Sequence, residues 1–461
     1  MRPKLRLVSL LTCVYVATVA LIAAVPSVAQ VQSVLTRFNA RSDGSGPRGG
    51  LIVDSAGNLY GTSTWGGNGQ TDICRNGPIG GCGTVFKLSP PPPGSGKWTE
   101  TVLHVFMQTP DGSYPTGNLV MDKSGNLYGT TAQGGVNSRG SVYQLSPPLA
   151  QGDPWTETIL YSFQQGSSDG QNPYAGLVID DAGNLYGTTA YGGPCNQGTV
   201  FELSPPVAQG DPWMEQVIHG FHYSCNGQVT NDGAAPQSSL VLGKNGQLFG
   251  TAFNGGEFGG GIVFRLTPPS GGRTNWSELV LYSFVGGVGG HYPLAGLSYY
   301  GGSLYGTTLA GGSGGSCIFN YLGCGIVFQL SPAGPGLPWT FNTIYSFTGS
   351  GDGQNPYAGV IFDKNGTLYG TTNGGGNFSC DDSYSHGCGV VYQLTPPVNV
   401  GDPWIQSTLY AFNGDADGRN SAAPLVIGKN NALFGTTFAG GNMQCTDYGS
   451  AGCGTVFKVV P

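Results

Sequence analysis

The stretch AGLVIDDAGNLYGTTAYGG, residues 175–193, has close copies elsewhere in the chain. AGVIFDKNGTLYGTTNGGG begins at Ala358, and GNLVMDKSGNLYGTTAQGG begins at Gly117. The shared core is Leu-Tyr/Phe-Gly-Thr, which occurs seven times at spacings of 56 to 68 residues. The seven copies begin at Leu59, Leu127, Leu185, Leu248, Leu304, Leu368 and Leu433. A chain that repeats a unit of this length is built from repeated structural modules.

Each repeat contains four segments with the character of β-strands. In the third repeat they are Ala175–Asp180, Asn184–Ala190, Gly198–Ser204 and Trp213–Phe221, and Gly- and Pro-rich turn signals separate them. A four-stranded unit that recurs seven times at this period is typical of a propeller. The sequence therefore predicts an all-β fold, a seven-bladed β-propeller with four-stranded blades.

The two ends of the chain favour a closed ring over an open solenoid. The segment Gln30–Phe38 (QVQSVLTRF) matches the fourth segment of a repeat, Trp155–Phe163 (WTETILYSF), whereas the chain ends just after a third segment, Gly454–Val460. The last repeat thus lacks a fourth strand, which the N-terminal segment can supply. Pairing of these ends removes the open sheet edges that a solenoid has to cap. We expect the N-terminal strand to close the last blade.

Composition and charge exclude several classes of protein. The 461 residues include 82 Gly and 31 Pro, and only 9% are charged. Gly and Pro are the poorest helix formers, so this composition favours short strands joined by tight turns. The formal net charge is −7. Because nucleic acid and anionic membrane surfaces both attract basic patches, we expect neither as a partner.

Residues 1–29 have the layout of an export signal. Three basic residues precede an apolar run, Leu7–Val25, and a group of small residues ends at Ala29. Cleavage after Ala29 would leave a propeller domain of residues 30–461, and we expect it to be a secreted or periplasmic monomer. The apolar run is long enough to span a bilayer, so an uncleaved membrane anchor is the alternative.

The cysteines agree with export. Ten of the eleven follow the signal, an even number for a compartment in which disulfides persist. Four loops between second and third segments carry two cysteines each, separated by six or seven residues, whereas zinc ligands are usually closer together. We therefore expect disulfides and no metal. The pairs are Cys74–Cys82, Cys317–Cys324, Cys380–Cys388 and Cys445–Cys453, which leaves Cys195 and Cys225 as a fifth pair.

These four loops belong to repeats 1, 5, 6 and 7, which are consecutive in a closed ring and share one face. They are longer than the corresponding loops of the other repeats, and they carry polar and aromatic residues that do not recur. The candidate ligand-binding residues are Trp65, Asp72, Phe319, Tyr321, Phe378, Asp381, Asp382, Tyr384, His386, Asp447 and Tyr448. Aromatic rings beside carboxylates suit carbohydrate. The other interpretation is that the aromatics cover loop backbone and the acids keep the surface soluble.

Catalytic signals are weak, and we assign no catalytic residue and no cofactor. Asp381, Asp382 and His386 are an acid/base candidate, and two loops could supply a glycosidase carboxylate pair, but the sequence does not give either separation. His219, His222 and Cys225 are an alternative metal set, although Cys225 is expected to pair with Cys195. Motifs of zinc peptidases and phosphate-binding loops are absent from the sequence.

The repeated pattern GNLYGTT…GG…GTVF…LSP resembles the Gloeobacter/Verrucomicrobium-type (GloVer) tandem repeat of exported bacterial proteins. The resemblance covers residues 30–461. It implies an exported or surface-anchored repeat protein, and it brings no established activity or catalytic residues.

This resemblance and the four cysteine-containing loops together predict a protein that binds an extracellular polysaccharide or another surface protein. A glycan hydrolase or lyase and a purely structural envelope protein are the alternatives.

Overall fold

The computed structural model describes residues 32–461 except for several short segments. These exceptions are residues 68–73, 75–79, 151, 165, 209, 226, 272–274, 314–316, 318–322, 335, 381–385, 400, 444 and 448–449. The expected signal segment therefore lies outside the described residues.

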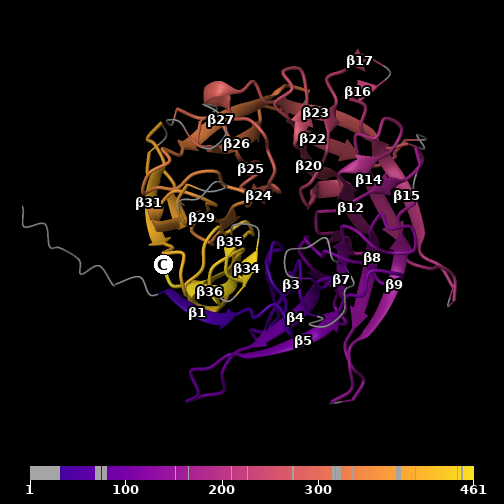
Figure 1. Ribbon diagram of the computed structural model, residues 1–461. Helices are drawn as coiled ribbons and strands as arrows, with labels where there is room; N and C mark the ends of the chain where they lie inside the picture. The colour runs from indigo at the N-terminus through magenta and orange to yellow at the C-terminus, as the bar shows by residue number, and fades with distance from the viewer. Residues whose placement is uncertain are drawn as a thin grey trace, which may run out of the picture.

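Seven four-stranded antiparallel sheets surround a common axis, as the sequence predicted (Figure 1). We number the blades 1 to 7 by repeat and name the strands of each blade A to D from the axis outward. In that order, the strands of blades 1 to 7 are β2 (Ile52–Val53), β3 (Leu59–Ser63), β4 (Thr84–Ser89), β5 (Thr99–Val105); β6 (Val120–Met121), β7 (Leu127–Thr131), β8 (Ser141–Ser146), β9 (Thr156–Ser162); β11 (Val178–Ile179), β12 (Leu185–Thr189), β14 (Thr199–Ser204), β15 (Met214–Gly220); β19 (Val241–Leu242), β20 (Leu248–Ala252), β22 (Ile262–Thr267), β23 (Ser277–Ser283); β24 (Ser298–Tyr300), β25 (Ser303–Thr308), β26 (Ile326–Pro332), β27 (Trp339–Ser346); β28 (Ile361–Phe362), β29 (Leu368–Thr371), β30 (Val390–Thr395), β31 (Ile405–Ala411); and β32 (Val426–Ile427), β33 (Leu433–Thr437), β36 (Thr455–Val459), β1 (Gln32–Arg37).

Short elements decorate the loops. The small strand pairs are β10 (Gly170–Gln171) with β13 (Tyr191–Gly192), β16 (Ser224–Cys225) with β17 (Gln228–Val229), β18 (Gly233–Ala234) with β21 (Asn254–Gly255), and β34 (Thr446–Asp447) with β35 (Ser450–Ala451). Single 3₁₀ turns are η1 (Lys244–Gly246), η2 (Gly287–Gly289), η3 (Phe378–Cys380) and η4 (Lys429–Asn431). None of the helical turns in the described part of the chain has the length or apolar character needed to span a bilayer.

The N-terminal strand closes the ring, as predicted. Strand β1 pairs antiparallel with β36, and the register runs from Gln32 opposite Val459 to Arg37 opposite Thr455. Figure 1 places β1, near the start of the described chain, along the outer edge of the blade that ends at the C-terminus. Phe38 and Phe86, from the two sides of this junction, belong to one buried cluster. The core is therefore continuous across the closure.

Both faces of each blade pack against a neighbouring blade, which explains the repeated Leu-Tyr pair. Leu185 joins a cluster with Phe163 of blade 2, whereas Tyr186, the next residue, joins a cluster with Leu248 of blade 4. Successive side chains of a strand point to opposite faces, so this strand is buried on both. At Gly187, a Cβ would lie 2.5 Å from Cζ of Phe201, so glycine is what admits that ring.

The aspartate that follows strand A in most repeats is the partner of the core tyrosine. Asp180 accepts hydrogen bonds from the backbone N–H groups of Ala182 and Asn184 through Oδ1, and its Oδ2 accepts from the Tyr186 hydroxyl at 3.2 Å. Repeats 4 and 7 have Gly in place of this Asp and Phe in place of the Tyr, so hydroxyl and acceptor are lost together there, because a buried hydroxyl without a partner is costly. Repeat 5 has Tyr300 in place of the Asp and keeps Tyr305, whose hydroxyl accepts from Nε2 of Gln329 at 2.8 Å.

The threonine of the core links each of blades 1 to 6 to the next blade. The Thr188 hydroxyl donates to the backbone oxygen of Ser238 at 3.1 Å, and the Thr130 hydroxyl donates to that of Ala175 at 2.7 Å. Both acceptors precede strand A of the following blade. Packing and hydrogen bonding thus account for every residue of the Leu-Tyr-Gly-Thr core.

A second polar contact recurs at the outer edge of the junctions between blades. At the junction of blades 2 and 3, the Tyr161 hydroxyl donates to Asp169 at 2.9 Å, and Glu215 of strand β15 approaches the same carboxylate. Burial, with a further contribution from the charge of Asp169, raises the pKa of Glu215 to about 8. In blade 6, Gln406 occupies the position that Glu215 occupies in blade 3. Each of the two lies opposite the corresponding Leu of strand C in its own blade. Glutamine is the neutral isostere of protonated glutamate, which agrees with Glu215 keeping its proton.

We expect deletion of residues 30–38 to lower the melting temperature of the whole protein, because blade 7 would lose its outer strand and expose the edge of β36. Calorimetry and gel filtration measure the effect. A deletion variant as stable and as monodisperse as the parent would contradict the importance of the closure.

The raised pKa of Glu215 predicts a dependence of stability on pH. Its pKa in the folded protein lies above the unfolded value of about 4.3, so its stabilising contribution is present at low pH and is lost as pH rises toward about 8. E215Q should therefore show a smaller fall in melting temperature between pH 5.5 and pH 8.5 than the parent. Q406E, which places a carboxyl group beside Asp352, is the matched reverse variant and should show a larger fall. If E215Q lowers the melting temperature relative to the parent by the same amount at pH 5.5 and at pH 8.5, Glu215 is ionised and paired in the folded protein.

Candidate functional site

One face of the ring is built by the D-to-A connections together with the ends of the B strands. In every blade the connection pairs with the residue that follows strand B. The pairs are Ser45 with Trp65, Ser113 with Gln133, β10 with β13, β18 with β21, His291 with Ala310, Gln354 with Gly374, and Arg419 with Ala439. This pairing holds the residues just before each strand A in a fixed position around the axis.

Five disulfides fasten this face. They are Cys74–Cys82, Cys195–Cys225, Cys317–Cys324, Cys380–Cys388 and Cys445–Cys453, the pairing expected from the sequence. Four lie within the B-to-C loops of blades 1, 5, 6 and 7. Cys195–Cys225 joins the B-to-C loop of blade 3 to the connection that leads to blade 4.

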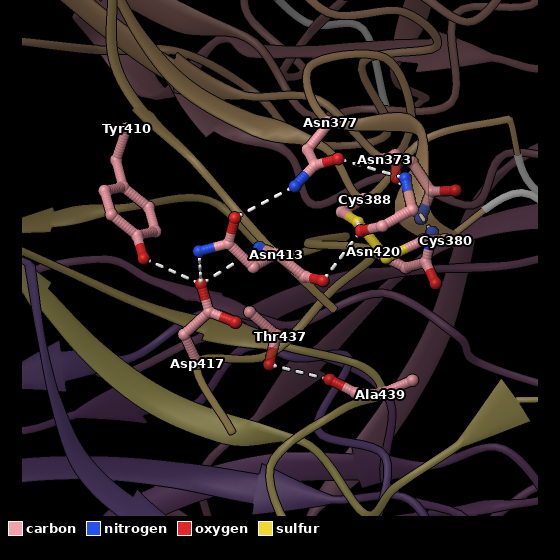
Figure 2. Close-up of a disulfide and its surroundings, with 11 residues drawn as sticks. Asn373, Asn377, Cys380, Cys388, Tyr410, Asn413, Asp417, Asn420, Thr437 and Ala439 are labelled. Atoms are coloured by element: carbon pink, nitrogen blue, oxygen red, sulfur yellow. Dashed lines mark hydrogen bonds between the residues drawn. A yellow bond between two sulfur atoms is a disulfide. The ribbon is translucent and has the colours of Figure 1, made fainter. Parts of the chain in front are cut away.

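The stapled loop of blade 6 is also tied to the neighbouring connection by hydrogen bonds (Figure 2). The amide of Asn377 donates to Oδ1 of Asn413 at 2.9 Å, and the Ser379 hydroxyl donates to the backbone oxygen of Asn413 at 2.9 Å. Asp417 in turn accepts from Tyr410 at 2.7 Å and from the Asn413 backbone N–H at 3.0 Å. The disulfide thus belongs to a continuous polar network rather than to an isolated loop tip.

The described residues include only some of the predicted ligand-binding residues. Phe378 lies in η3 with 47% of its surface exposed, and His386 is also exposed. The backbone of Asp447 lies in β34. Outside the described residues are Asp72, Phe319, Tyr321, Asp381, Asp382, Tyr384 and Tyr448. The proposed acid/base set of Asp381, Asp382 and His386 is therefore described only at His386.

Trp65 forms a cluster with Phe438 and Arg48. It lies directly after strand β3, it is half-buried, and its ring packs edge-to-face on Phe438 of blade 7 with centroids 5.4 Å apart. The guanidinium carbon of Arg48 lies 4.7 Å from the centroid of Phe438 and 5.6 Å from that of Trp65. Cation–π contacts of this kind hold an arginine side chain in place.

Gly46 makes room for this cluster. Its φ is +60°, and the corresponding residues of the other six repeats are also left-handed although none of them is glycine. At Gly46 a Cβ would lie 2.6 Å from Cζ3 of Trp65 and 3.1 Å from Cε2 of Phe438. Glycine is needed here for the two rings rather than for the backbone conformation alone.

Arg48 belongs to a ring of seven equivalent positions just before strand A. The seven residues are of six different types, with Tyr occurring twice, although the sequence around them repeats. The seven residues are Arg48, Thr116, Tyr174, Gln237, Leu294, Tyr357 and Ala422. All seven line a cavity of about 510 Å³ on the axis of the propeller. We call this ring the channel mouth.

Arg48 is the single charged residue among the described residues that line this cavity. Its side chain is open to the channel, yet the surrounding protein displaces enough water to lower its pKa, an effect that Tyr357 and Tyr174 oppose. Burial raises the pKa of both tyrosines, and the charge of Arg48 opposes that rise. Both hydroxyls therefore stay protonated at neutral pH and can donate hydrogen bonds beside the guanidinium.

Sequence reasoning placed the chemistry in the long loops and missed the channel mouth. The sequence did contain a signal for it. The residue that follows the Pro of repeats 1 to 6 changes in almost every copy, although the residues around it repeat. Arg48 is also the one basic residue at that position.

Two groups of side chains outside the mouth have donor atoms suited to a metal ion. They are His104, Asp111 and Glu157, and His219, Asp232 and Glu278. Both occupy the junction position of Tyr161, Asp169 and Glu215. His104 Nε2 lies 3.2 Å from Asp111 and 3.5 Å from Glu157, so the imidazole already serves the carboxylates as a partner.

The fold and the repeat define the class of this protein as a disulfide-stapled tandem-repeat β-propeller. The family model of the Gloeobacter/Verrucomicrobia repeat matches residues 21–228 and 72–319, which together span more than half of the chain. The chain belongs to this family, as its repeated pattern indicated.

No curated protein matches the chain in sequence. Among solved structures, the chain is similar to a Trichoderma reesei protein of carbohydrate-active enzymes family AA12, solved with calcium, at 13% identity and a TM-score of 0.43, covering 94% of this chain and 96% of that one. It is also similar to the Trypanosoma rangeli sialidase at 11% identity and a TM-score of 0.41, covering 93% of this chain and 59% of that one. We draw no functional conclusion from either.

The disulfides permit a test of how the loops are stabilised. Cys195–Cys225 spans 30 residues and Cys380–Cys388 spans 8. In the chain-entropy account, C195S/C225S should lower the unfolding free energy by about 3.5 kcal/mol and C380S/C388S by about 2.5 kcal/mol. Chemical denaturation of both double variants measures the difference. A larger loss from C380S/C388S would show that the blade 6 network depends on its disulfide in the folded state.

Proposed function

We propose that this protein is an exported carbohydrate-binding propeller that takes its ligand at the channel mouth, on the face fastened by the disulfides. The observation that carries the proposal is the cavity lined by Arg48, Tyr174 and Tyr357, in which Arg48 is held by the rings of Trp65 and Phe438. Five disulfides suit an oxidising compartment outside the cytoplasm, which supports export.

The size and the lining of the cavity fit a small saccharide. Sites for small ligands typically measure about 300–1,000 Å³, and this cavity has about 510 Å³. A sugar's apolar face stacks on aromatic rings, and its hydroxyl groups need neutral donors and acceptors such as Tyr174, Gln237 and Thr116. The mouth combines both kinds of surface.

The same lining favours binding over hydrolysis at this position. Most glycosidases place two carboxyl groups on either side of the scissile bond. The described residues that line the cavity include neither Asp nor Glu. We therefore propose a binding function and not a carboxylate-pair hydrolase at the mouth.

The tyrosines of the channel mouth give the test of this proposal. A glycan array identifies a saccharide ligand, and isothermal titration then compares the parent with Y174A, because Tyr174 lines the cavity. Loss of a central aromatic contact should weaken binding at least tenfold. F258A is the control, because Phe258 is 55% exposed in the B-to-C loop of blade 4 and does not line the cavity.

Circular dichroism of Y174A is measured beside the titration, since Tyr174 is half-buried. A folded Y174A that binds normally, with binding lost in F258A, would place the site in the loops of blade 4. Binding to an extracellular protein but to no glycan would favour the other partner class, and product formation on prolonged incubation would favour an enzyme.

A further inference from the structure

The channel mouth holds one cation and no acid to balance it. Among the seven mouth residues, Arg48 is charged and the other six are neutral. In the described part of the chain no ion pair joins a carboxylate to Arg48, whose guanidinium packs on the rings of Trp65 and Phe438, and Tyr174 and Tyr357 line the same cavity. Cation–π contacts stabilise the guanidinium without using its N–H donors on an anion.

This arrangement contrasts with the rest of the protein, whose formal net charge is −7. An acidic surface repels anions in general. A lone cation within such a protein, partly desolvated in an axial cavity, therefore marks one place where a negative group is favoured. Its low-polarity surroundings strengthen attraction to that group relative to water.

We infer that the channel mouth recognises the carboxylate of an acidic sugar, with Arg48 as its counter-ion and the Tyr174 and Tyr357 hydroxyls as further donors. This inference rests on the carbohydrate function proposed above and names the substrate class. The planar guanidinium matches a planar carboxylate through two parallel hydrogen bonds. One arginine balances one negative charge, whereas a phosphate monoester carries nearly two at neutral pH.

The test uses pairs of saccharides that differ only in charge. Dimers to tetramers of galacturonic, glucuronic and mannuronic acids are titrated against the parent, each beside its carboxyl-reduced neutral counterpart. At least one acid should bind about tenfold or more tightly than its reduced form, in keeping with a charge-assisted hydrogen bond. R48Q should abolish this preference, whereas R139Q, which removes a cation from the same face away from the cavity, should retain it.

The outcomes separate this inference from the proposed function. If neutral sugars bind the parent as well as the acids do, or if R48Q keeps the preference, the carboxylate inference is wrong while carbohydrate binding stands. A preference for sulfated over carboxylated sugars would also overturn it. If no saccharide binds, the carbohydrate proposal falls, and thermal shifts with acetate and sulfate then decide the anion site by itself. If acetate or sulfate raises the melting temperature of the parent but not that of R48Q, the anion site stands. Equal shifts in the two proteins would overturn it.

Discussion

Each four-stranded blade of this protein has to bury both of its faces, and most of the structure follows from that constraint. Leu185 and Tyr186 are adjacent in sequence and yet fill two different cores, one toward blade 2 and the other toward blade 4. A blade with one free face would expose a continuous row of apolar side chains, so an open row of blades would need caps. Closure of the ring satisfies every blade with the same sequence pattern. The repeat is specific because its Leu and Tyr side chains contact the two neighbouring blades, while its Gly admits a ring of the same blade.

The seven repeats also behave as a set of substitutions at equivalent positions. Where Asp180 has no counterpart in repeats 4 and 7, the tyrosine that would donate to it is phenylalanine. At the junction of blades 4 and 5, Gly289 and Phe341 stand where the three preceding junctions have an acid on each side, and Phe341 stacks on Tyr282 with centroids 4.0 Å apart. In repeats 4 and 7 the two polar partners are lost together, because a buried polar group that loses its partner costs about 1–3 kcal/mol, whereas in repeat 5 Tyr305 keeps its hydroxyl and pairs with Gln329 instead. These contacts are therefore structural, and they identify positions where function should not be sought.

The same logic explains what the sequence could predict. Residues such as Leu185 and the paired cysteines recur, so blade number, ring closure and disulfide pairing were readable from periodicity. Trp65 was recognised as unusual, but its contact with Phe438 joins residues from opposite ends of the chain, which local sequence does not reveal. Arg48 was missed because its importance depends on the axial cavity and on the absence of acid among the described residues that line it. Several predicted loop residues, among them Asp381 and Tyr384, lie outside the described residues and stay predictions.

Ring closure and the proposed site depend on the same segment. Strand β1 completes blade 7, and the connection from β1 to β2 then carries Arg48 into blade 1, where it meets Trp65 from that blade and Phe438 from blade 7. This connection is held on both sides, since the Ser45 N–H donates to the backbone oxygen of Trp65 at 2.8 Å and the Gly46 N–H donates to that of Cys453 at 2.9 Å. The N-terminal strand therefore does more than cover an edge. Its pairing with β36 fixes the path of the chain that sets Arg48 between the two rings, so the arginine reaches its position at the mouth only in the closed propeller.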